Sequence, residues 1–552
     1  MPLTLIVVAV IMLICVLCNK ITLKIGIPML FAFILLGMLF GSDGLFRIPF
    51  EDFQFAEQIC TVALIFIMFY GGFGTNWNAA RKVAPCALLL SSVGVILTAA
   101  FTGLFCHYVL RFEWLESFLV GAVLGSTDAA SVFSTLRSRR LNLKFGTASL
   151  LELESGSNDP WAYMLTIVIL CAMSGDLSAG NALIILLQQI VFGVGCGAGI
   201  AAIGTFALRR FRFGTEGFEA IFTLAVALLS YAVPAAIGGN GYLSVYIVGI
   251  VLGNQQIAFK KALVHFFDGI TGLMQMLVFF LLGLLAFPSQ IPGILLPSVL
   301  IALFLALIAR PAATALIMTP FKAKWRQQAV ISWAGLRGAT SIVFAVMATV
   351  SSAYTKNDLF HIVFCVVLLS IGIQGSLLPW ISRRLDMLDD RADVMRTFSD
   401  YNAETEAQFI RLSVQKNHAW VGKALRELQM PPNMAVALIE RENRQIVPDG
   451  KTVIEEKDIL ILGAVEAEGQ TAVPLCETAV GLKHPWRGKT LAEAAPDSGV
   501  FVVMAKRHGR LLIPNGSLRI RAGDTLVTVK RDRIACKEEE ENGSGGGMER
   551  ID

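Results

Sequence analysis

Long apolar stretches alternate with short polar loops over the first two thirds of the chain. A helix needs about 20 residues to cross the roughly 30 Å of hydrocarbon in a bilayer, and most of these stretches are close to that length. They lie near residues 3–18, 26–41, 55–73, 84–106, 115–135, 150–174, 182–207, 216–236, 241–254, 262–287, 293–319, 328–350 and 358–381. The pattern predicts a polytopic α-helical membrane protein with about 13 transmembrane helices.

Charge divides the chain at the end of the last stretch. Of the 552 residues, 55% are hydrophobic and 16% are charged, and 36 of the 88 charged residues fall in 1–382 against 52 in 383–552. These counts are about 9% and 31%, whereas a soluble domain carries about 25% charged residues. The composition therefore excludes a secreted disulfide scaffold, a disordered chain and a purely soluble enzyme, and it predicts a soluble tail after the membrane part.

Basic residues mark alternate loops of the membrane part. One set of loops holds Lys20, Lys24, Arg81, Lys82, Arg137, Arg139, Arg140, Lys144, Arg209, Arg210, Arg212, Lys260, Lys261, Lys322, Lys324 and Arg326, and the other holds Arg47, Arg111 and Lys356. Loops rich in Lys and Arg stay on the cytoplasmic side. We therefore expect a bacterial inner (plasma) membrane protein with its N-terminus outside and its C-terminal tail in the cytoplasm.

Five ionisable residues inside the predicted spans stand out. They are Asp128, Glu154, Asp159, Arg310 and Arg337. Such residues are costly at bilayer depth and are candidates for function. Opposite charges hold each other ionised, so we expect the three carboxylates to face the two arginines. A structural reading, in which all five form ion pairs that fix helix packing, stays open.

Glycine-rich motifs interrupt two of these spans. Gly-Ser-Thr-Asp-Ala occupies 125–129, and Gly-Leu-Arg-Gly-Ala occupies 335–339. The two spans are seven apart in order, and a shift of seven spans inverts the orientation. The positions predict inverted repeats with two broken helices that line a polar cavity at the midplane.

The span that begins near residue 150 combines carboxylates with other oxygen and amide groups. Glu154 and Asn158 share one helix face, Ser155 and Asp159 share the adjacent one, and Pro160 is expected to disturb the helix beside them. A hard monovalent cation prefers oxygen ligands. If one carboxylate holds either a proton or a cation, competition alone couples the two fluxes.

These three motifs together resemble those of the bacterial cation:proton antiporters of the NhaP type. The resemblance covers about residues 1–382. It implies a thirteen-helix inverted-repeat fold, with a dimerisation domain and a moving core domain, that works as a homodimer. It also implies electroneutral one-for-one exchange, which is associated with an Asn-Asp pair such as Asn158-Asp159.

The same resemblance implies roles for individual residues. Asp159 binds the cation or the proton, and Asp128 lies beside it. Thr127 and Ser155 supply oxygen ligands. Glu154, Asn158 and Arg337 form a stabilising network of ion pairs and hydrogen bonds, to which we add Arg310 as a buried partner for a carboxylate.

The tail contains one module twice. Ten residues recur 66 positions later without a gap: His418, Trp420, Gly422, Lys423, Leu425, Arg441, Pro448, Gly450, Asp458 and Leu460. Each copy predicts a strand, a short helix, a strand, a hairpin turn at Pro448-Asp-Gly or Pro514-Asn-Gly, and a last strand. We expect a linker over 383–398, α+β domains over 399–465 and 466–532, and a disordered end over 533–552.

Each copy resembles the C-terminal lobe of the RCK regulators of potassium transport, the TrkA-C type. Such lobes pair across a dimer and often bind a small regulatory ligand. The tail has no predicted strand followed by Gly-x-Gly-x-x-Gly, so we expect no pocket for a nicotinamide or adenine nucleotide there. A purely assembling role for the pair of lobes stays open.

The sequence therefore favours an antiporter that exchanges K⁺, or Na⁺, for H⁺ in cation, pH and volume homeostasis, under control of its tail. We expect no resident cofactor, no enzymatic activity and no nucleic-acid partner. The alternative is an RCK-regulated cation channel, but a Thr-Val-Gly-Tyr-Gly filter is missing and Gly-Gly-Phe-Gly-Thr-Asn at 71–76 is a poor substitute.

Overall fold

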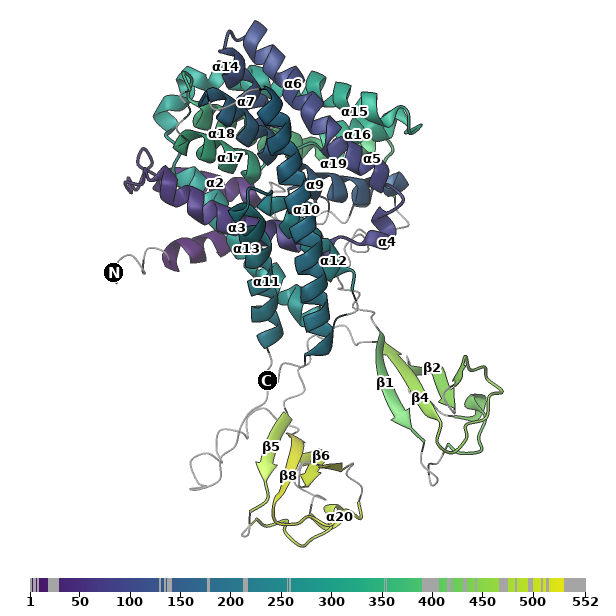
Figure 1. The fold of residues 1–552 in the computed structure, drawn as a ribbon. Helices are drawn as coiled ribbons and strands as arrows, with labels where there is room; N and C mark the ends of the chain where they lie inside the picture. The colour runs from purple at the N-terminus through teal and green to yellow at the C-terminus, as the bar shows by residue number, and fades with distance from the viewer. Residues whose placement is uncertain are drawn as a thin grey trace. The chain divides into compact units, whose positions relative to one another are not determined.

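The structure is a computed structural model of the chain (Figure 1). It describes residues 2, 6, 9–17, 29–128, 131–133, 136, 141–175, 179–211, 217–255, 257, 260–351, 353, 355–389, 407–414, 418, 420–428, 430, 434–441, 444–465, 475–481, 484–494, 500–507, 510–512 and 516–530. The chain forms two compact units, Met1–Glu404 and Thr405–Asp552.

The first unit is built from helices. They are α2 (Met29–Phe40), α3 (Phe53–Gly74), α4 (Trp77–Ala80), α5 (Ala84–Ser91), α6 (Val93–Tyr108), α7 (Trp114–Val123), α9 (Thr147–Met173), α10 (Ala179–Arg210), α11 (Phe218–Ala236), α12 (Gly241–Gly253), α13 (Lys260–Leu284), α14 (Ile291–Phe304), α15 (Arg310–Met318), α16 (Trp325–Trp333), α17 (Ala339–Val350), α18 (Leu359–Leu369) and α19 (Ser376–Arg384). Residues 9–17 are helical as well, and π-helical turns at Leu305–Ala309 and Ser370–Gly375 join α14 to α15 and α18 to α19.

Helical segments coincide with all of the apolar stretches, which confirms the polytopic helical fold. Seven described helical segments are long and apolar enough to cross a membrane, and α2, α7, α12 and α17 are shorter apolar helices. The total of about 13 crossings stays a prediction.

Helix contacts divide this unit into two groups. In the first, α3 packs against α12 and α13, α2 against α13, and α10 against α11 and α12. In the second, α5 and α7 pack against α9, α6 against α7, α15 against α16, and α18 against α14 and α17. The groups meet where α9 contacts α3, α10 and α12, and where α17 contacts α3 and α13 (Figure 1). Two helices of the second group, α9 and α17, therefore carry most of the boundary.

Both predicted breaks are present. The chain leaves the helix after Val123 and is helical again at 131–133, and it leaves the helix after Trp333 and resumes at Ala339. Pro160 does not break the helix, because α9 continues through that residue to Met173. The missing N–H of a proline leaves one carbonyl free, but the helix tolerates it here.

A short antiparallel contact ties the end of the last membrane helix to the start of α9. Leu143 pairs with Leu388, the Lys144 amide donates to the Met387 carbonyl at 2.8 Å, and the Asp389 amide donates to the Asn142 carbonyl at 2.9 Å. Lys144 also forms an ion pair with Asp386 at 2.9 Å. We call residues 385–389 the strap.

The second unit contains two four-stranded antiparallel sheets. The first has the order β1-β4-β2-β3, with β1 (Ala407–Ser413), β2 (Met434–Arg441), β3 (Arg444–Ile446) and β4 (Ile459–Val465). The second has the order β5-β8-β6-β7, with β5 (Leu475–Ala479), β6 (Val500–Arg507), β7 (Arg510–Leu512) and β8 (Asp524–Lys530). The sequence repeat is therefore a structural repeat, down to a register shift between Val436 and Leu438 that recurs between Val502 and Met504.

Two details of the predicted module are wrong. In the first copy the hairpin joins β2 to β3, with Arg441 opposite Arg444, so Pro448 follows the hairpin, whereas Pro514 and Asn515 of the second predicted turn lie outside the described residues. The short helices shrink to one turn at Leu425–Glu427 and four residues in α20 (Leu491–Ala494). The predicted domain limits stay predictions, and the segment 533–552 lies outside the described residues.

Candidate cation site

The two breaks meet, and each satisfies backbone groups of the other. The amide of Asp128 donates to the carbonyl of Leu336 at 2.8 Å, and the Arg337 guanidinium donates to the carbonyl of Ser126 at 2.8 Å. The amide of Arg337 donates to the Ser370 hydroxyl at 3.0 Å. Unwound backbone inside a membrane needs such partners, so the crossing is stable only as a pair.

Asp159 lies against this crossing. Its helix, α9, presents the carboxylate between the two breaks, and the side chain is almost completely buried. The Ser126 hydroxyl donates to Oδ1, and the Thr340 hydroxyl donates to Oδ2 at 3.3 Å. One hydroxyl comes from each broken segment, so both segments hold the same carboxylate.

Asp128 is fixed by its own segment. The Ser131 hydroxyl donates to its Oδ2 at 2.5 Å, and the Ser131 amide donates to its Oδ1 at 3.3 Å. Gly338 of the other segment lies directly against it, since a Cβ on that glycine would stand 2.4 Å from Oδ2. A side chain at 338 would therefore push Asp128 out of place.

Hydrogen bonds from α9 hold Thr127 on both sides. The Asn158 amide group donates to the Thr127 hydroxyl at 2.5 Å, and the Ser155 hydroxyl donates to the Thr127 carbonyl at 2.6 Å. Thr127 and Ser155 both line the cavity described below. Their oxygen atoms are therefore within reach of a bound ion.

The buried arginines take different partners from those that the resemblance implies. Glu154 pairs with Arg310, and both side chains are at most 2% exposed. Gly335 leaves room for this arginine, because a Cβ there would lie 2.8 Å from its Nε. Arg337 instead hydrogen-bonds to the Ser126 carbonyl, as noted above, and does not pair with Glu154 in the described part of the chain. In the described part of the chain Glu154 thus pairs with Arg310, Asn158 with Thr127 and Arg337 with Ser126, and the stabilising role of these residues stays a prediction.

A cavity of about 390 Å³ between the two helix groups reaches these residues. The second group contributes Thr127, Asp128, Phe133, Glu152, Ser155, Gly156, Asp159 and Thr340, and the first contributes Met29, Ile67, Met68, Tyr70, Gly71, Tyr246, Asp268, Thr271, Gly272 and Gln275. Four carboxylates therefore line it, and Asp268 accepts a hydrogen bond from the Tyr70 hydroxyl at 3.1 Å. Carboxylates along a low-dielectric cavity raise the local concentration of cations.

Ser126, Thr340 and Asp268 are not among the site residues predicted from the sequence. Asp268 carried a usable signal, because it is a carboxylate within the predicted span 262–287. Ser126 lies inside the 125–129 motif and Thr340 directly follows the 335–339 motif, but neither hydroxyl is distinguished further, since hydroxyls are common in membrane helices and usually bond to a carbonyl of their own helix.

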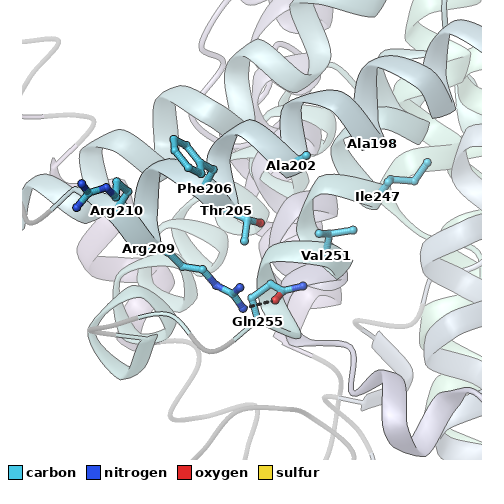
Figure 2. Close-up of a pocket in the computed structure, with 9 residues that line it drawn as sticks. All are labelled: Ala198, Ala202, Thr205, Phe206, Arg209, Arg210, Ile247, Val251 and Gln255. Atoms are coloured by element: carbon cyan, nitrogen blue, oxygen red, sulfur yellow. Dashed lines mark hydrogen bonds between the residues drawn. The ribbon is translucent and has the colours of Figure 1, made fainter.

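A second hollow lies between α10 and α12 and has a volume of about 600 Å³ (Figure 2). It is lined by Ala198, Ala202, Thr205, Phe206, Arg209, Arg210, Ile247, Val251 and Gln255, and the Arg209 guanidinium donates to Gln255 at 2.6 Å. Two arginines and no carboxylate line it, so it is unsuited to a cation.

Both units of the chain are similar to known protein families. The transmembrane sodium/hydrogen exchanger family matches residues 6–384, and the TrkA-C domain matches 409–468 and 477–534. The K(+)/H(+) antiporter NhaP2 of Shewanella sp. (strain MR-4) is 34% identical over 81% of this chain and 79% of its own length. The K(+)/H(+) antiporter NhaP of Alkalimonas amylolytica is 36% identical over 70% of this chain and 67% of its own length.

A more distant relative and a solved structure complete the comparison. The Na(+)/H(+) antiporter ApNhaP of Aphanothece halophytica is 28% identical over 64% of this chain and 69% of its own length. The structure of the sodium proton antiporter MjNhaP1 from Methanocaldococcus jannaschii at pH 8 matches with a TM-score of 0.61 at 24% identity, covering 68% of this chain and 99% of that one. This last likeness concerns the fold.

Proposed function

This chain belongs to the sodium/hydrogen exchanger family, and we propose that it exchanges K⁺, in preference to Na⁺, for H⁺ at Asp159. The relatives named above are transporters, so the chain is an antiporter rather than an enzyme, and the channel alternative is not favoured. Potassium is preferred here because relatives at 34–36% identity are named K(+)/H(+) antiporters, whereas the Na(+)/H(+) antiporter is 28% identical.

One observation carries the assignment to Asp159. It is a buried carboxylate at a cavity, and hydroxyl groups donate the hydrogen bonds to it. The two nearby buried arginines are engaged elsewhere, Arg310 with Glu154 and Arg337 with a backbone carbonyl. Asp159 therefore keeps the freedom to take either a proton or a cation, which Glu154 has lost to its ion pair.

Exchange then follows from charge. An ionised Asp159 is costly to move through a low-dielectric barrier, but a proton or a monovalent cation neutralises it. The Asp159 carboxylate can therefore move from one side of the membrane to the other, together with the second group of helices, only when it is neutralised. Asp128, Thr127 and Ser155 supply further oxygen ligands for the dehydrated cation. One cation moves in one direction and one proton in the other during each cycle, so the exchange is electroneutral.

We infer that the cavity opens toward the cytoplasm. Tyr70 and Gly71 lie shortly before the basic pair Arg81-Lys82, and Asp268 lies shortly after Lys260-Lys261. Under the positive-inside rule both loops are cytoplasmic. We therefore assign the opening of the cavity to the cytoplasmic face of the inner membrane, with the N-terminus outside.

The tail is assigned to regulation of a homodimer. Two TrkA-C domains in series supply two lobes in each chain, and a small regulatory ligand would bind where lobes pair across the dimer. The competing assignment is assembly alone, in which the lobes hold two chains together without altering transport.

Reconstituted protein tests the exchange. Proteoliposomes carrying an internal pH dye should release a preset proton gradient on addition of K⁺, and less strongly with Na⁺, Li⁺ or Rb⁺. Asp159→Asn should abolish the response, because the neutral amide cannot exchange a proton and has no negative charge for a cation to neutralise. Asp52→Asn is the matched control, since Asp52 caps α3 and asparagine caps a helix equally well. Full activity of the Asp159 variant would refute the site, and cation flux driven by voltage without proton movement would favour a channel.

A further inference from the structure

The two hydroxyls on Asp159 differ in what surrounds them. Ser126 is 1% exposed and is not among the residues that line the cavity, whereas Thr340 lines it and is partly exposed. Ser126 donates to Oδ1 and Thr340 to Oδ2, so each carboxylate oxygen has its own hydroxyl. The Ser126 side of the carboxylate lies away from the cavity, and we call it the dry side, whereas the Thr340 side faces the cavity.

Thr340 is also unusual for a hydroxyl in a membrane helix. Thr349, in the same helix α17, donates to the carbonyl of Ala345 at 2.9 Å, one turn earlier. Thr340 is the second residue of α17, directly after the break at 334–338, and therefore lacks a regular helical turn before it. Its hydroxyl turns to Asp159 instead, through a long hydrogen bond of 3.3 Å.

We propose that the Thr340 hydroxyl is a ligand of the transported cation and that Ser126 is a positioning residue that holds the Asp159 carboxylate from the dry side. The inference rests on the proposed exchange at Asp159. A hydroxyl has one donor and two acceptor lone pairs, so Thr340 can donate to the carboxylate and offer an oxygen to a cation at the same time. A cation at this place would lie between Oδ2 and the threonine oxygen, on the cavity side.

The arrangement distinguishes cation binding from proton binding at Asp159. A proton needs only the carboxylate, whereas a cation gains an additional oxygen ligand from Thr340. Loss of this oxygen weakens cation binding without removing proton binding. The distance between Asp159 and Thr340 also depends on the crossing of the two breaks, which ties cation affinity to the helix arrangement.

Substitutions of Thr340 separate the hydroxyl from the shape of the side chain. Thr340→Val keeps the shape and removes the oxygen, and Thr340→Ser keeps the oxygen. In proteoliposomes at one fixed pH, the valine variant should raise the apparent KM for K⁺ about five- to tenfold, as expected for one lost polar contact, with the maximal rate within about twofold. The serine variant should stay within about twofold on both counts, and Thr349→Val is the control in the same helix.

A thiol offers an independent readout of ligation. Thr340→Cys keeps the size of the side chain but replaces a hard oxygen with a soft sulfur. The ratio of apparent affinities for Tl⁺ over K⁺ should rise in this variant and stay unchanged in the valine variant. This measurement remains informative if the valine variant is not stable enough to reconstitute.

Ser126→Ala tests the positioning role. The carboxylate loses a donor on its dry side, so protonation of Asp159 is favoured and the pH at half-maximal exchange should move upward. The apparent KM for K⁺ at the most alkaline pH should change less than in Thr340→Val. Ser117→Ala is the control, because within the described residues the Ser117 hydroxyl bonds to the Glu113 carbonyl of the preceding turn.

The outcomes separate the two proposals. An unchanged KM in Thr340→Val, or a serine variant as impaired as the valine variant, overturns the ligand role of Thr340. An unchanged pH profile in Ser126→Ala overturns the positioning role. If Asp159→Asn retains exchange, the proposed site itself fails, whatever the hydroxyl variants do.

Discussion

The amide of Asp128 donates a hydrogen bond to the carbonyl of Leu336 at 2.8 Å. The two residues belong to breaks in helices that are far apart in the sequence, and this bond joins the breaks at their crossing. It also brings the Ser126 and Thr340 hydroxyls to the same carboxylate on α9. The crossing therefore builds the site, because none of the three segments carries the complete set of oxygen atoms.

Gly338→Ala should disable exchange. A Cβ at this position would stand 2.4 Å from the Asp128 side chain, and relief requires the two breaks to separate. We expect a cost of about 1–3 kcal/mol in stability and at least a tenfold loss of exchange rate in proteoliposomes. Gly269→Ala is the control, since a Cβ there meets no atom within 4 Å. Normal exchange in the Gly338 variant would show that the close contact is not required.

Arg310→Ala should destabilise the membrane unit strongly. It leaves the Glu154 carboxylate buried without its partner, which typically costs about 3–5 kcal/mol. The apparent melting temperature of the detergent-solubilised protein should fall clearly, and the double variant Arg310→Met with Glu154→Leu should recover part of it. Arg326→Ala removes an exposed pair with Asp386 and should have little effect. Equal melting temperatures for the two arginine variants would contradict the structural role of this pair.

Acid should unfold the second lobe of the tail through Asp524. Hydrogen bonds from Arg507, at 2.7 Å to each carboxylate oxygen, hold the pKa of Asp524 below its ordinary value. The stability that this provides is complete above the ordinary aspartate pKa of about 3.9 and is lost as the pH falls through the lowered value of the folded state. In Asp524→Asn this acid dependence should weaken, and stability near neutral pH should drop by about 1.5–3 kcal/mol.

Hydrogen exchange in the whole chain measures this effect. Amides of β6 and β8 should exchange faster in Asp524→Asn, after correction for the intrinsic rate at each pH. The first lobe is the internal control, because Arg441 and Asp458 keep the equivalent pair at 2.8 Å. Equal protection of both lobes in the variant would contradict the prediction.

Removal of 399–552 should leave exchange running but change its response to pH. The truncation keeps the strap at 385–389, which pairs with the loop before α9 and therefore supports the helix that carries Asp159. Comparison of pH profiles in proteoliposomes measures the effect, and a second truncation from 385 tests the strap. Complete inactivity of a monodisperse 399–552 truncation would argue for an obligatory role, and an identical pH profile would favour assembly alone.

The sequence was sufficient for the architecture. Apolar stretches predict helices because the bilayer core leaves backbone groups no other partner, and the glycine-rich motifs at 125–129 and 335–339 predict the breaks. The repeat at an offset of 66 predicts two equal lobes, because the same residues at the same spacing form the same strands. Asp128, Glu154, Asp159, Arg310 and Arg337 stand out in the sequence, because a charge in an apolar span is rare.

The partners of those residues were decided by the tertiary structure. From the sequence, either arginine could neutralise any of the three acids. Only the folded chain brings Arg310, at the start of α15, within ion-pair distance of Glu154. Ser126 and Thr340 are ordinary hydroxyls until the two breaks cross and place one on each oxygen of Asp159. A charged residue within an apolar stretch is recognised from the sequence alone. Its partner is set by distances of a few ångström, which exist only in the folded chain.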